Sequence, residues 1–369
     1  MLSQSKVIVH YIKLAFFPVG LCLDYEWEPV RSFREVWWQM LCISSLFIIT
    51  VWLVWRKKPI GFWGAWFFLI LGATSSVIPI PDIIFEHRMY LPLAAIIFGV
   101  VILFFKIENE ISFSGDNHER KWISFFFVSL FIIATILLVF LTRSRNEKYQ
   151  SKEVMLRDIV RTNPDNCRQT LALITSLIHS AKFDEAEEML IKLIERLDVR
   201  INDSKNCARE KNIFQQAAAY NAYGCILMEK GQFSNAVEKL QTAVSLASNK
   251  PVFQSNLAMA LYHLGKKTEA IEVCKDGIKK YADYAKFYAL LGYFYANDGD
   301  EKNALHYYQK AYEILPSDLS VRMDLAKLLV VSKNLSLRDY NKGLQLLTEL
   351  EKETGKKAHN VYYLMAMAY

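Results

Sequence analysis

Two short polar segments lie beside long apolar stretches and hold the residue types best suited to chemistry. The first contains Asp24, Glu26 and Glu28 next to Tyr25 and Trp27. Carboxylates this close could bind a metal ion, because hard cations take oxygen ligands. An acidic loop at a membrane interface, anchored by its two aromatic rings, is the simpler interpretation. We therefore expect no metal there.

The second polar segment contains Glu86 and Arg88, which follow shortly after Asp82. Charged side chains at the edge of an apolar stretch usually pair with one another or have a function. Two interpretations are equally open. Glu86 and Arg88 pair with Asp82, or Arg88 holds the phosphate of a lipid-linked substrate through its planar guanidinium group.

The rest of the chain contains no pattern that predicts a catalytic set. His263 and His306 are expected to be structural or surface residues. The six cysteines form no CxxC pair and no Cys/His ligand spacing, so we expect neither a metal nor a cofactor.

The composition of the 369-residue chain changes near residue 141. Phe, Trp, Ile, Leu and Val dominate before this point, and the sequence after it is typical of a water-soluble domain. The net charge of +6 is spread over both parts and forms no basic stripe. We therefore expect no nucleic-acid partner.

The apolar part contains four stretches long enough to cross a bilayer as helices, which takes about 20 residues each. Gly61, Gly64 and Gly72 in the second stretch favour close helix packing. Residues 1–35 before them form an interfacial or re-entrant segment, from Val7 to Leu23, and the acidic loop. The predicted transmembrane domain covers residues 36–141, with spans at about 36–55, 60–80, 89–105 and 122–141.

The second part, residues 150–369, repeats with a period of 34 residues. Small residues and turn glycines recur at this spacing, which is the pattern of tetratricopeptide (TPR) repeats, pairs of antiparallel helices that stack into a solenoid. The sequence therefore predicts an all-α protein with a multi-span helical domain followed by a TPR α-solenoid. The expected TPR core residues are Tyr220, Gly224, Ala236, Ala258, Ala270, Gly292, Ala304 and Pro316.

The repeats on either side of residues 217–316 are less regular. Ile174 and Leu177 indicate an earlier repeat, separated by a 16-residue insertion in the polar stretch 198–211. About five extra residues precede Gly343. Residues 361–369 resemble the first helix of one more repeat, so we expect the chain to be a piece of a larger protein or to pair with another one.

Four tyrosines gather in the third regular repeat. Tyr295 and Tyr308 occupy core positions of the TPR pattern, whereas Tyr293 and Tyr307 are candidates for lining a concave peptide groove. A polypeptide is therefore the expected partner of the array.

Several motifs, in the same order, resemble the C-terminal portion of TPR-containing membrane glycosyltransferases of the GT-C type, the transmembrane-and-TPR protein O-mannosyltransferases and their bacterial relatives. The motifs are Pro18, Leu21, Asp24 and Tyr25; Ser75-Ser76-Val77-Ile78-Pro79; Glu86-His87-Arg88-Met89-Tyr90-Leu91-Pro92; Arg145-Asn146; and Asn163-Pro164-Asp165. The resemblance implies that Glu86, His87 and Arg88 contact a polyprenyl-phosphate-linked sugar donor and that the array holds the polypeptide acceptor. The catalytic aspartates of that family lie before the matching region, so we expect no catalytic residue in this chain and leave open whether it is an enzyme.

Basic residues and the resemblance together predict the topology. Arg56, Lys57 and Lys58 mark the loop between the first two spans as cytoplasmic, although Arg143 and Arg145 count against this orientation. We expect an integral protein of the bacterial inner membrane with a periplasmic, non-cytoplasmic TPR domain. The alternative function is a non-enzymatic, membrane-anchored TPR scaffold for protein–protein interaction.

Overall fold

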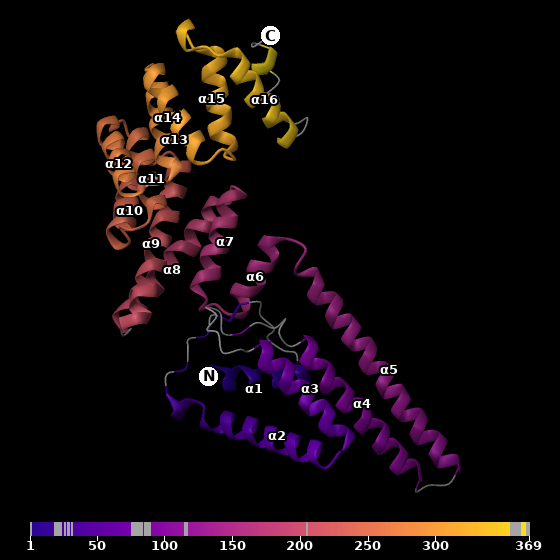
Figure 1. Ribbon diagram of the computed structural model, residues 1–369. Coiled ribbons are helices and arrows are strands. Elements are labelled where there is room, and N and C mark those ends of the chain that lie inside the picture. Colours follow the sequence, from indigo (N-terminus) through magenta and orange to yellow (C-terminus); the bar gives the residue numbers. More distant parts are fainter. Residues whose placement is uncertain are drawn as a thin grey trace. The chain divides into compact units, whose positions relative to one another are not determined.

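The structure is a computed structural model in which every regular element of the described residues is a helix (Figure 1). It divides into two compact units, Met1–Ser176 and Leu177–Tyr369. The division falls within one helix, Cys167–His179. The described residues are 2–17, 24–25, 27, 30, 32–74, 84, 90–113, 117–203, 206–354 and 363–366.

The first unit consists mainly of long apolar helices. Neighbouring helices pack in chain order, α1 on α2, α2 on α3, α3 on α4 and α4 on α5. Its elements are α1 (Leu2–Phe16), the 3-10 turn η1 (Phe33–Glu35), α2 (Trp37–Trp55), α3 (Pro59–Thr74), α4 (Tyr90–Phe113), α5 (Asn117–Glu147), α6 (Lys152–Thr162) and most of α7 (Cys167–His179).

Helices α2 to α5 correspond to the four predicted spans. Two stretches, Trp37–Trp55 and Val128–Glu147, are long and apolar enough to cross a membrane, and the apolar parts of α3 and α4, Pro59–Gly72 and Pro92–Lys106, are shorter. Helix α1 has 15 residues, about 22 Å at 1.5 Å per residue. The interfacial or re-entrant role of this segment stays a prediction.

Two of the three predicted packing glycines lie where α3 approaches α2. A Cβ atom on Gly61 would come within 2.6 Å of the Val54 backbone nitrogen, and one on Gly64 within 2.6 Å of Thr50 Oγ1. Gly72 is different, because a Cβ atom there would meet nothing within 4 Å. The prediction of close packing therefore holds for Gly61 and Gly64 and is wrong for Gly72.

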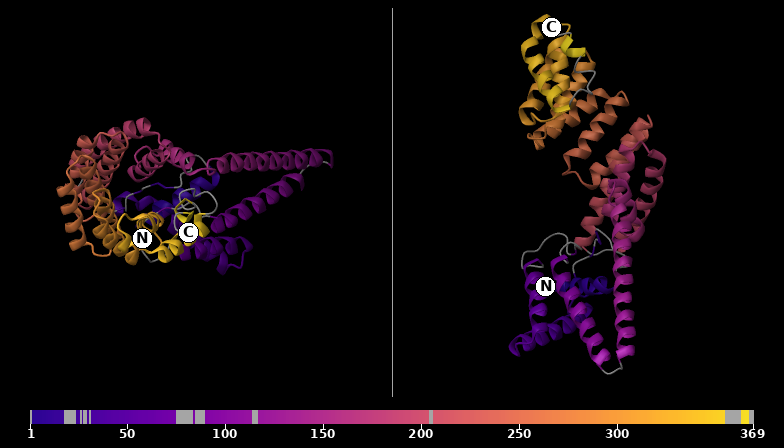
Figure 2. Two further views of the ribbon diagram at one scale, coloured as in Figure 1. Left: turned by 90° about the horizontal axis from the view of Figure 1, so that it is seen from above. Right: turned by 90° about the vertical axis from the view of Figure 1, so that its right-hand side faces the viewer.

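The second unit is a row of antiparallel helix pairs that follows an arc when seen from above (Figure 2). The first helices of successive pairs also pack on one another, α9 on α11 and α11 on α13, so they form the inner layer of the arc. The helices after α7 are α8 (Phe183–Asp203), α9 (Asn206–Glu229), α10 (Phe233–Leu246), α11 (Pro251–His263), α12 (Lys267–Lys280), α13 (Ala285–Asn297), α14 (Glu301–Ile314), α15 (Leu319–Val331), η3 (Leu335–Leu337) and α16 (Tyr340–Thr354).

Glycine ends the first helix of each regular pair. Gly231, Gly265 and Gly299 have φ angles of +72°, +88° and +80°, a conformation that is costly for residues with a Cβ atom. The corresponding residue of the earlier pair is Ala181, with φ +56°. The same turn is therefore built there without glycine, at a cost of about 1 kcal/mol.

Small residues let the two helices of a pair approach closely. A Cβ atom on Gly224 would lie 2.4 Å from Leu240 Cγ, and one on Gly292 would lie 2.7 Å from Tyr308 Cδ1. Four alanines at the other predicted core positions are completely buried: Ala236, Ala258, Ala270 and Ala304.

The two remaining predicted core residues lie nearer the surface. Tyr220 is half-buried and packs against Ala217, Ala243 and Phe253. Pro316 is exposed in the turn between α14 and α15. Its fixed φ and missing N–H are suited to ending a helix, so it acts on chain direction and not on core packing.

The irregular parts of the array have distinct structures. The insertion lengthens α8 to 21 residues and α9 to 24, against 14 in α10. The extra residues before α16 include η3, and Glu301 holds their start, because its carboxylate accepts hydrogen bonds from Ser332 Oγ at 2.5 Å and Lys333 N at 3.1 Å. Of the predicted last helix, residues 363–366 are described and helical, and Leu364 packs on the preceding pair.

Candidate functional site

The Glu86, His87 and Arg88 segment lies outside the described residues, as does Asp82. The choice between an internal ion pair and a lipid-phosphate contact therefore stays a prediction.

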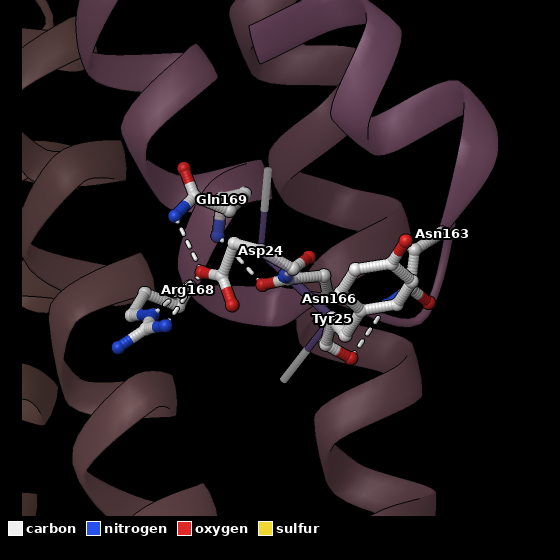
Figure 3. Close-up of polar contacts among 6 residues, drawn as sticks. All are labelled: Asp24, Tyr25, Asn163, Asn166, Arg168 and Gln169. Atoms are coloured by element: carbon white, nitrogen blue, oxygen red, sulfur yellow. Dashed lines mark hydrogen bonds and ion pairs between the residues drawn. The ribbon is translucent and has the colours of Figure 1, made fainter. Parts of the chain in front are cut away.

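The acidic loop is described at Asp24, and this carboxylate is held by side chains from the start of α7 (Figure 3). Asp24 Oδ2 accepts hydrogen bonds from Arg168 Nε at 3.0 Å, Arg168 Nη2 at 2.6 Å and Gln169 Nε2 at 2.6 Å. The Asp24 carboxylate is thus bound by charge-assisted hydrogen bonds from the protein's own side chains. Within the described part of the chain, no group of three or more His, Cys, Asp and Glu residues could hold a metal ion.

The main chain of the same loop is held by two asparagines (Figure 3). Asn166 Nδ2 donates to the carbonyl oxygen of Asp24 and Asn163 Nδ2 donates to that of Tyr25, both at 2.9 Å. Asn166 Oδ1 also accepts from the backbone N–H of Gln169 at 2.9 Å, as an N-cap residue does. Two successive carbonyls are thus bound by residues about 140 positions later, with separations of 142 and 138.

Aromatic rings connect this loop to α1. Tyr25 is buried, and its ring and that of Trp27 both make edge contacts with His10, with centroids 5.1 and 5.0 Å away. Lys6 Nζ lies 4.7 Å from the centre of the Trp27 ring, a cation–π contact. The predicted aromatic anchors therefore pack on the protein's own first helix.

Ion pairs fix the corner between α5 and α6. Arg145 Nη1 lies 2.8 Å from Asp158 Oδ2, and Lys148 Nζ lies 2.6 Å from Asp158 Oδ1. The side chains of Arg145 and Asp158 are each only 18% exposed. Arg145, which the sequence singled out, therefore has a structural role at this corner.

The inner layer of the array presents a partly exposed strip that we call the first-helix face. At its centre, Asn256 Nδ2 donates to Asn221 Oδ1 at 2.9 Å and contacts Cys225 Sγ at 3.5 Å. The Tyr262 and Tyr293 rings follow, 5.9 Å apart. The first-helix face comprises Asn221, Cys225, Asn256, Met259, Tyr262 and Tyr293, all of intermediate exposure.

The predicted tyrosine groove is only partly present. Tyr293 lies on the first-helix face. Tyr307 lies on the second helix of its pair and stacks on Tyr295, with an interplanar angle of 2° and a centroid distance of 5.5 Å. The Tyr307 ring thus packs against α13, and its groove role stays a prediction.

Two cysteines and one histidine of the array have surroundings that are typical of structural residues. Burial raises the pKa of Cys225 to about 11 and that of Cys274 to about 12, so both thiols are protonated and unreactive at neutral pH. His263 stacks on Phe233 at 5.2 Å, in agreement with a structural role.

Family comparisons identify the repeats. Residues 227–292 and 285–318 match two families described as tetratricopeptide repeat. The chain carries tetratricopeptide repeats. The matches cover the regular pairs, where the 34-residue period and the turn glycines are also found.

Curated relatives share the repeats over a short region. The chain is 31% identical over 111 residues to the small glutamine-rich tetratricopeptide repeat-containing protein 2 of Mycosarcoma maydis, covering 30% of this chain and 32% of that one. It is 26% identical over 114 residues to a TPR repeat-containing thioredoxin of Arabidopsis thaliana, covering 31% and 16%. The chain thus spans a third or less of these relatives.

Two solved structures are similar to this chain at low identity. A thermophilic TPR protein of Thermus thermophilus has a TM-score of 0.43 at 16% identity, covering 55% of this chain and 98% of that one. PilF of Pseudomonas aeruginosa has a TM-score of 0.40 at 17% identity, covering 63% and 94%.

Sequence patterns gave no role to Asn166, Asn221 or Asn256, and Asn163 entered only as part of a family motif. Asn221 and Asn256 are 35 residues apart, one more than the repeat period, so they occupy adjacent and not equivalent positions. That offset was a readable signal, because it brings side chains of neighbouring first helices together. No comparable signal connects Asn166 or Arg168 to Asp24.

Proposed function

We propose that this protein is a membrane-anchored TPR protein whose array binds an extended polypeptide on the first-helix face. The Asn221–Asn256 pair carries the proposal. Its internal hydrogen bond uses the oxygen of Asn221 and the amide group of Asn256. A carbonyl oxygen on Asn256 and an amide group on Asn221 remain for a ligand, and a peptide unit offers the complementary N–H and C=O groups.

Neighbouring side chains suit the same ligand. Tyr262, Tyr293 and Met259 supply adaptable apolar contact area beside the amides. Fixed amides with flexible apolar neighbours favour binding through the main chain with low side-chain selectivity.

Peptide binding by the full chain in detergent micelles tests this proposal. Immobilised peptides of varied sequence are the probe. Replacing Asn256 by Ala removes its carbonyl contact to the peptide and the hydrogen bond that fixes Asn221, so binding should weaken about tenfold, the equivalent of about 1.4 kcal/mol. Asn235→Ala, on the exposed surface of α10, is the matched control and should bind as the wild type. Equal losses in both variants, or a wild type that binds none of the peptides, would refute the proposal.

Membrane anchoring by the first unit is the second part of the proposal. The stretch Val128–Glu147 buries none of its residues and Trp37–Trp55 buries 6%. Apolar surfaces of this extent are rare on soluble monomers. Helix α2 also carries Trp37 and Trp38 at its start and Trp52 and Trp55 at its end, where amphipathic rings favour the two interfaces of a bilayer.

Orientation follows from the charges at the α2–α3 turn. Arg56, Lys57 and Lys58 support a cytoplasmic turn, which puts the end of α5 and the repeats on the non-cytoplasmic side. Protease added outside sealed spheroplasts should cleave the array. Protection of the array until the cells are lysed would reverse the orientation.

A role in sugar transfer from a polyprenyl-phosphate donor to a polypeptide is a further candidate. It is supported by the ordered motifs around Glu86, His87 and Arg88 and by the proposed polypeptide site. Binding of a polyprenyl-phosphate sugar to full-length protein in lipid nanodiscs tests it. Arg88→Ala should abolish binding and Arg56→Ala should not; equal binding by all three proteins would remove the candidate.

A further inference from the structure

We propose that residues 163–169 form a second polypeptide-binding site, which the chain occupies with its own Asp24–Tyr25 segment. This site lies at the start of α7, and its contacts belong to residues distinct from the first-helix face. It does not depend on the proposed function of that face.

The main-chain contacts are those of a peptide receptor. Asn163 and Asn166 each donate a side-chain amide hydrogen to one of two successive carbonyl oxygens, at 2.9 Å (Figure 3). Side-chain donors that bind backbone carbonyls recognise an extended chain independently of its side chains. Both asparagines lie just before α7, in the loop and at the N-cap. The side chain of Asn166 is held in place because its Oδ1 accepts a hydrogen bond from the backbone N–H of Gln169.

The side-chain contacts add selectivity for an acidic residue. Three N–H groups of Arg168 and Gln169 converge on Oδ2 of Asp24. The Asp24 side chain is 12% exposed, whereas that of Arg168 is 45% exposed. The carboxylate is thus enclosed while its cationic partner remains accessible from solvent. An Asn in place of Asp24 would lose the ionic contribution, which is a substantial part of such bonds.

The residue after the carboxylate is aromatic and buried. Tyr25 is 8% exposed and packs against His10 and Trp27. The bound segment is therefore an acidic residue followed by an aromatic one. Residues 163–169 bind its carboxylate and two carbonyl oxygens, and His10 and Trp27 contact its aromatic ring.

The origin of the occupant determines how the site behaves. A segment of the same chain competes as an intramolecular ligand, with an effective concentration set by the chain that connects it to the site. A separate polypeptide therefore gains access only when the Asp24–Tyr25 segment is released. The segment acts as an intramolecular ligand that covers the start of α7.

Competition by a peptide in solution tests this inference. The probe is a fluorescent peptide with the sequence of residues 21–30, added to full-length protein in detergent micelles and followed by fluorescence anisotropy. Asp24→Lys in the protein places a second cation beside Arg168 and should release the segment. We expect this variant to bind the peptide at least tenfold more tightly than the wild type, whose site is occupied. A peptide with Asn at the position of Asp24 should bind weakly to both.

Three further proteins make the result specific. Glu195→Lys, on the exposed surface of α8, changes the net charge by the same amount as Asp24→Lys. It should bind the peptide as weakly as the wild type does. Asp24→Lys combined with Arg168→Glu restores an ion pair of reversed polarity and should again exclude the peptide. Asp24→Lys combined with Asn163→Ala and Asn166→Ala should not bind it.

Two outcomes would overturn the inference. One is equal peptide binding by the wild type and Asp24→Lys. The other is an Asp24→Lys protein that binds no peptide. Hydrogen exchange of the α7 backbone amides then distinguishes a folded α7, whose amides are protected, from an unfolded one, whose amides exchange freely. In the protected case the site is not a receptor, and in the exchanging case the segment is part of the fold and not a ligand.

Discussion

The apolar helices of the first unit and the repeat helices of the second use similar residue types in opposite ways. In α11, seven of 13 residues are buried, among them Leu257 and Leu261. In α5, the stretch Val128–Glu147 buries none. The repeat helices bury their apolar side chains within the chain, whereas α5 leaves those of Val128–Glu147 exposed. Apolar content alone therefore does not identify a core; the spacing of small and bulky residues does.

The largest difference between the two regions should appear when a phenylalanine is removed. Phe287 is completely buried, and its Cζ would lie 2.5 Å from a Cβ atom on Gly277. Phe287→Ala should destabilise the array by about 3–5 kcal/mol. Phe140 on α5 is 67% exposed, so Phe140→Ala should leave array unfolding unchanged. Thermal unfolding followed by circular dichroism measures both, and similar losses would contradict the comparison.

Introducing a lysine should have the opposite pattern of effects, large on α5 and negligible on a repeat helix. Ile133 on α5 and Val199 on α8 are 62% and 61% exposed. If α5 lies in a bilayer, Ile133→Lys costs about 3 kcal/mol of insertion free energy and reduces the membrane-bound fraction. Val199→Lys places a charge in water and should have no effect. Carbonate extraction of membranes followed by immunoblotting compares the two, and equal retention would argue against a span at α5.

The regular part of the fold was predictable, and the docked loop was not. Gly231, Gly265 and Gly299 reveal the period because a positive φ angle favours one residue type. Ala181 adopts the same conformation without that signal, so the earlier turn was only inferred from neighbouring residues.

The candidate sites show a similar limit. Asp24 was recognised as a residue of interest, yet its partner Arg168 is 144 positions later. Periodicity predicts contacts within and between adjacent repeats, because these have fixed spacing. A contact between a loop and a distant helix start has no such spacing, and only the fold brings its residues together.

Replacing a glycine by alanine should also affect the two regions differently, with a smaller loss of stability than the phenylalanine substitution. Gly292 faces Tyr308, and a Cβ atom would approach its ring to 2.7 Å, whereas Gly72 on α3 has nothing within 4 Å. Gly292→Ala should destabilise the array by about 1–3 kcal/mol through overpacking. Gly72→Ala should be tolerated. Urea unfolding of the array and the expression level in membranes report the two effects; a tolerated Gly292→Ala would show that the array can adjust its helix spacing.

The smallest expected effect concerns a charge within the repeats. Burial raises the pKa of Asp324 on α15 above its usual value of 3.8, while Lys327, Lys286 and a hydrogen bond from Tyr308 oppose the change and Asp318 adds to it. The folded protein therefore binds this proton more tightly than the unfolded chain. Stability must then fall as the pH rises through the interval above 3.8, because the unfolded state binds fewer protons there.

Asp324→Asn removes this penalty and keeps an acceptor for Tyr308. Since the carboxyl is partly solvated, the gain at pH 7 should be under about 1 kcal/mol, and it should disappear below pH ~4. Chemical denaturation of both proteins between acidic and neutral pH measures the difference. A variant that is less stable than the wild type at pH 7 would mean that the ionised carboxylate is stabilised by Lys286 and Lys327. The repeat helices would then depend on a charge contact as well as on the small and bulky residues that set them apart from α5.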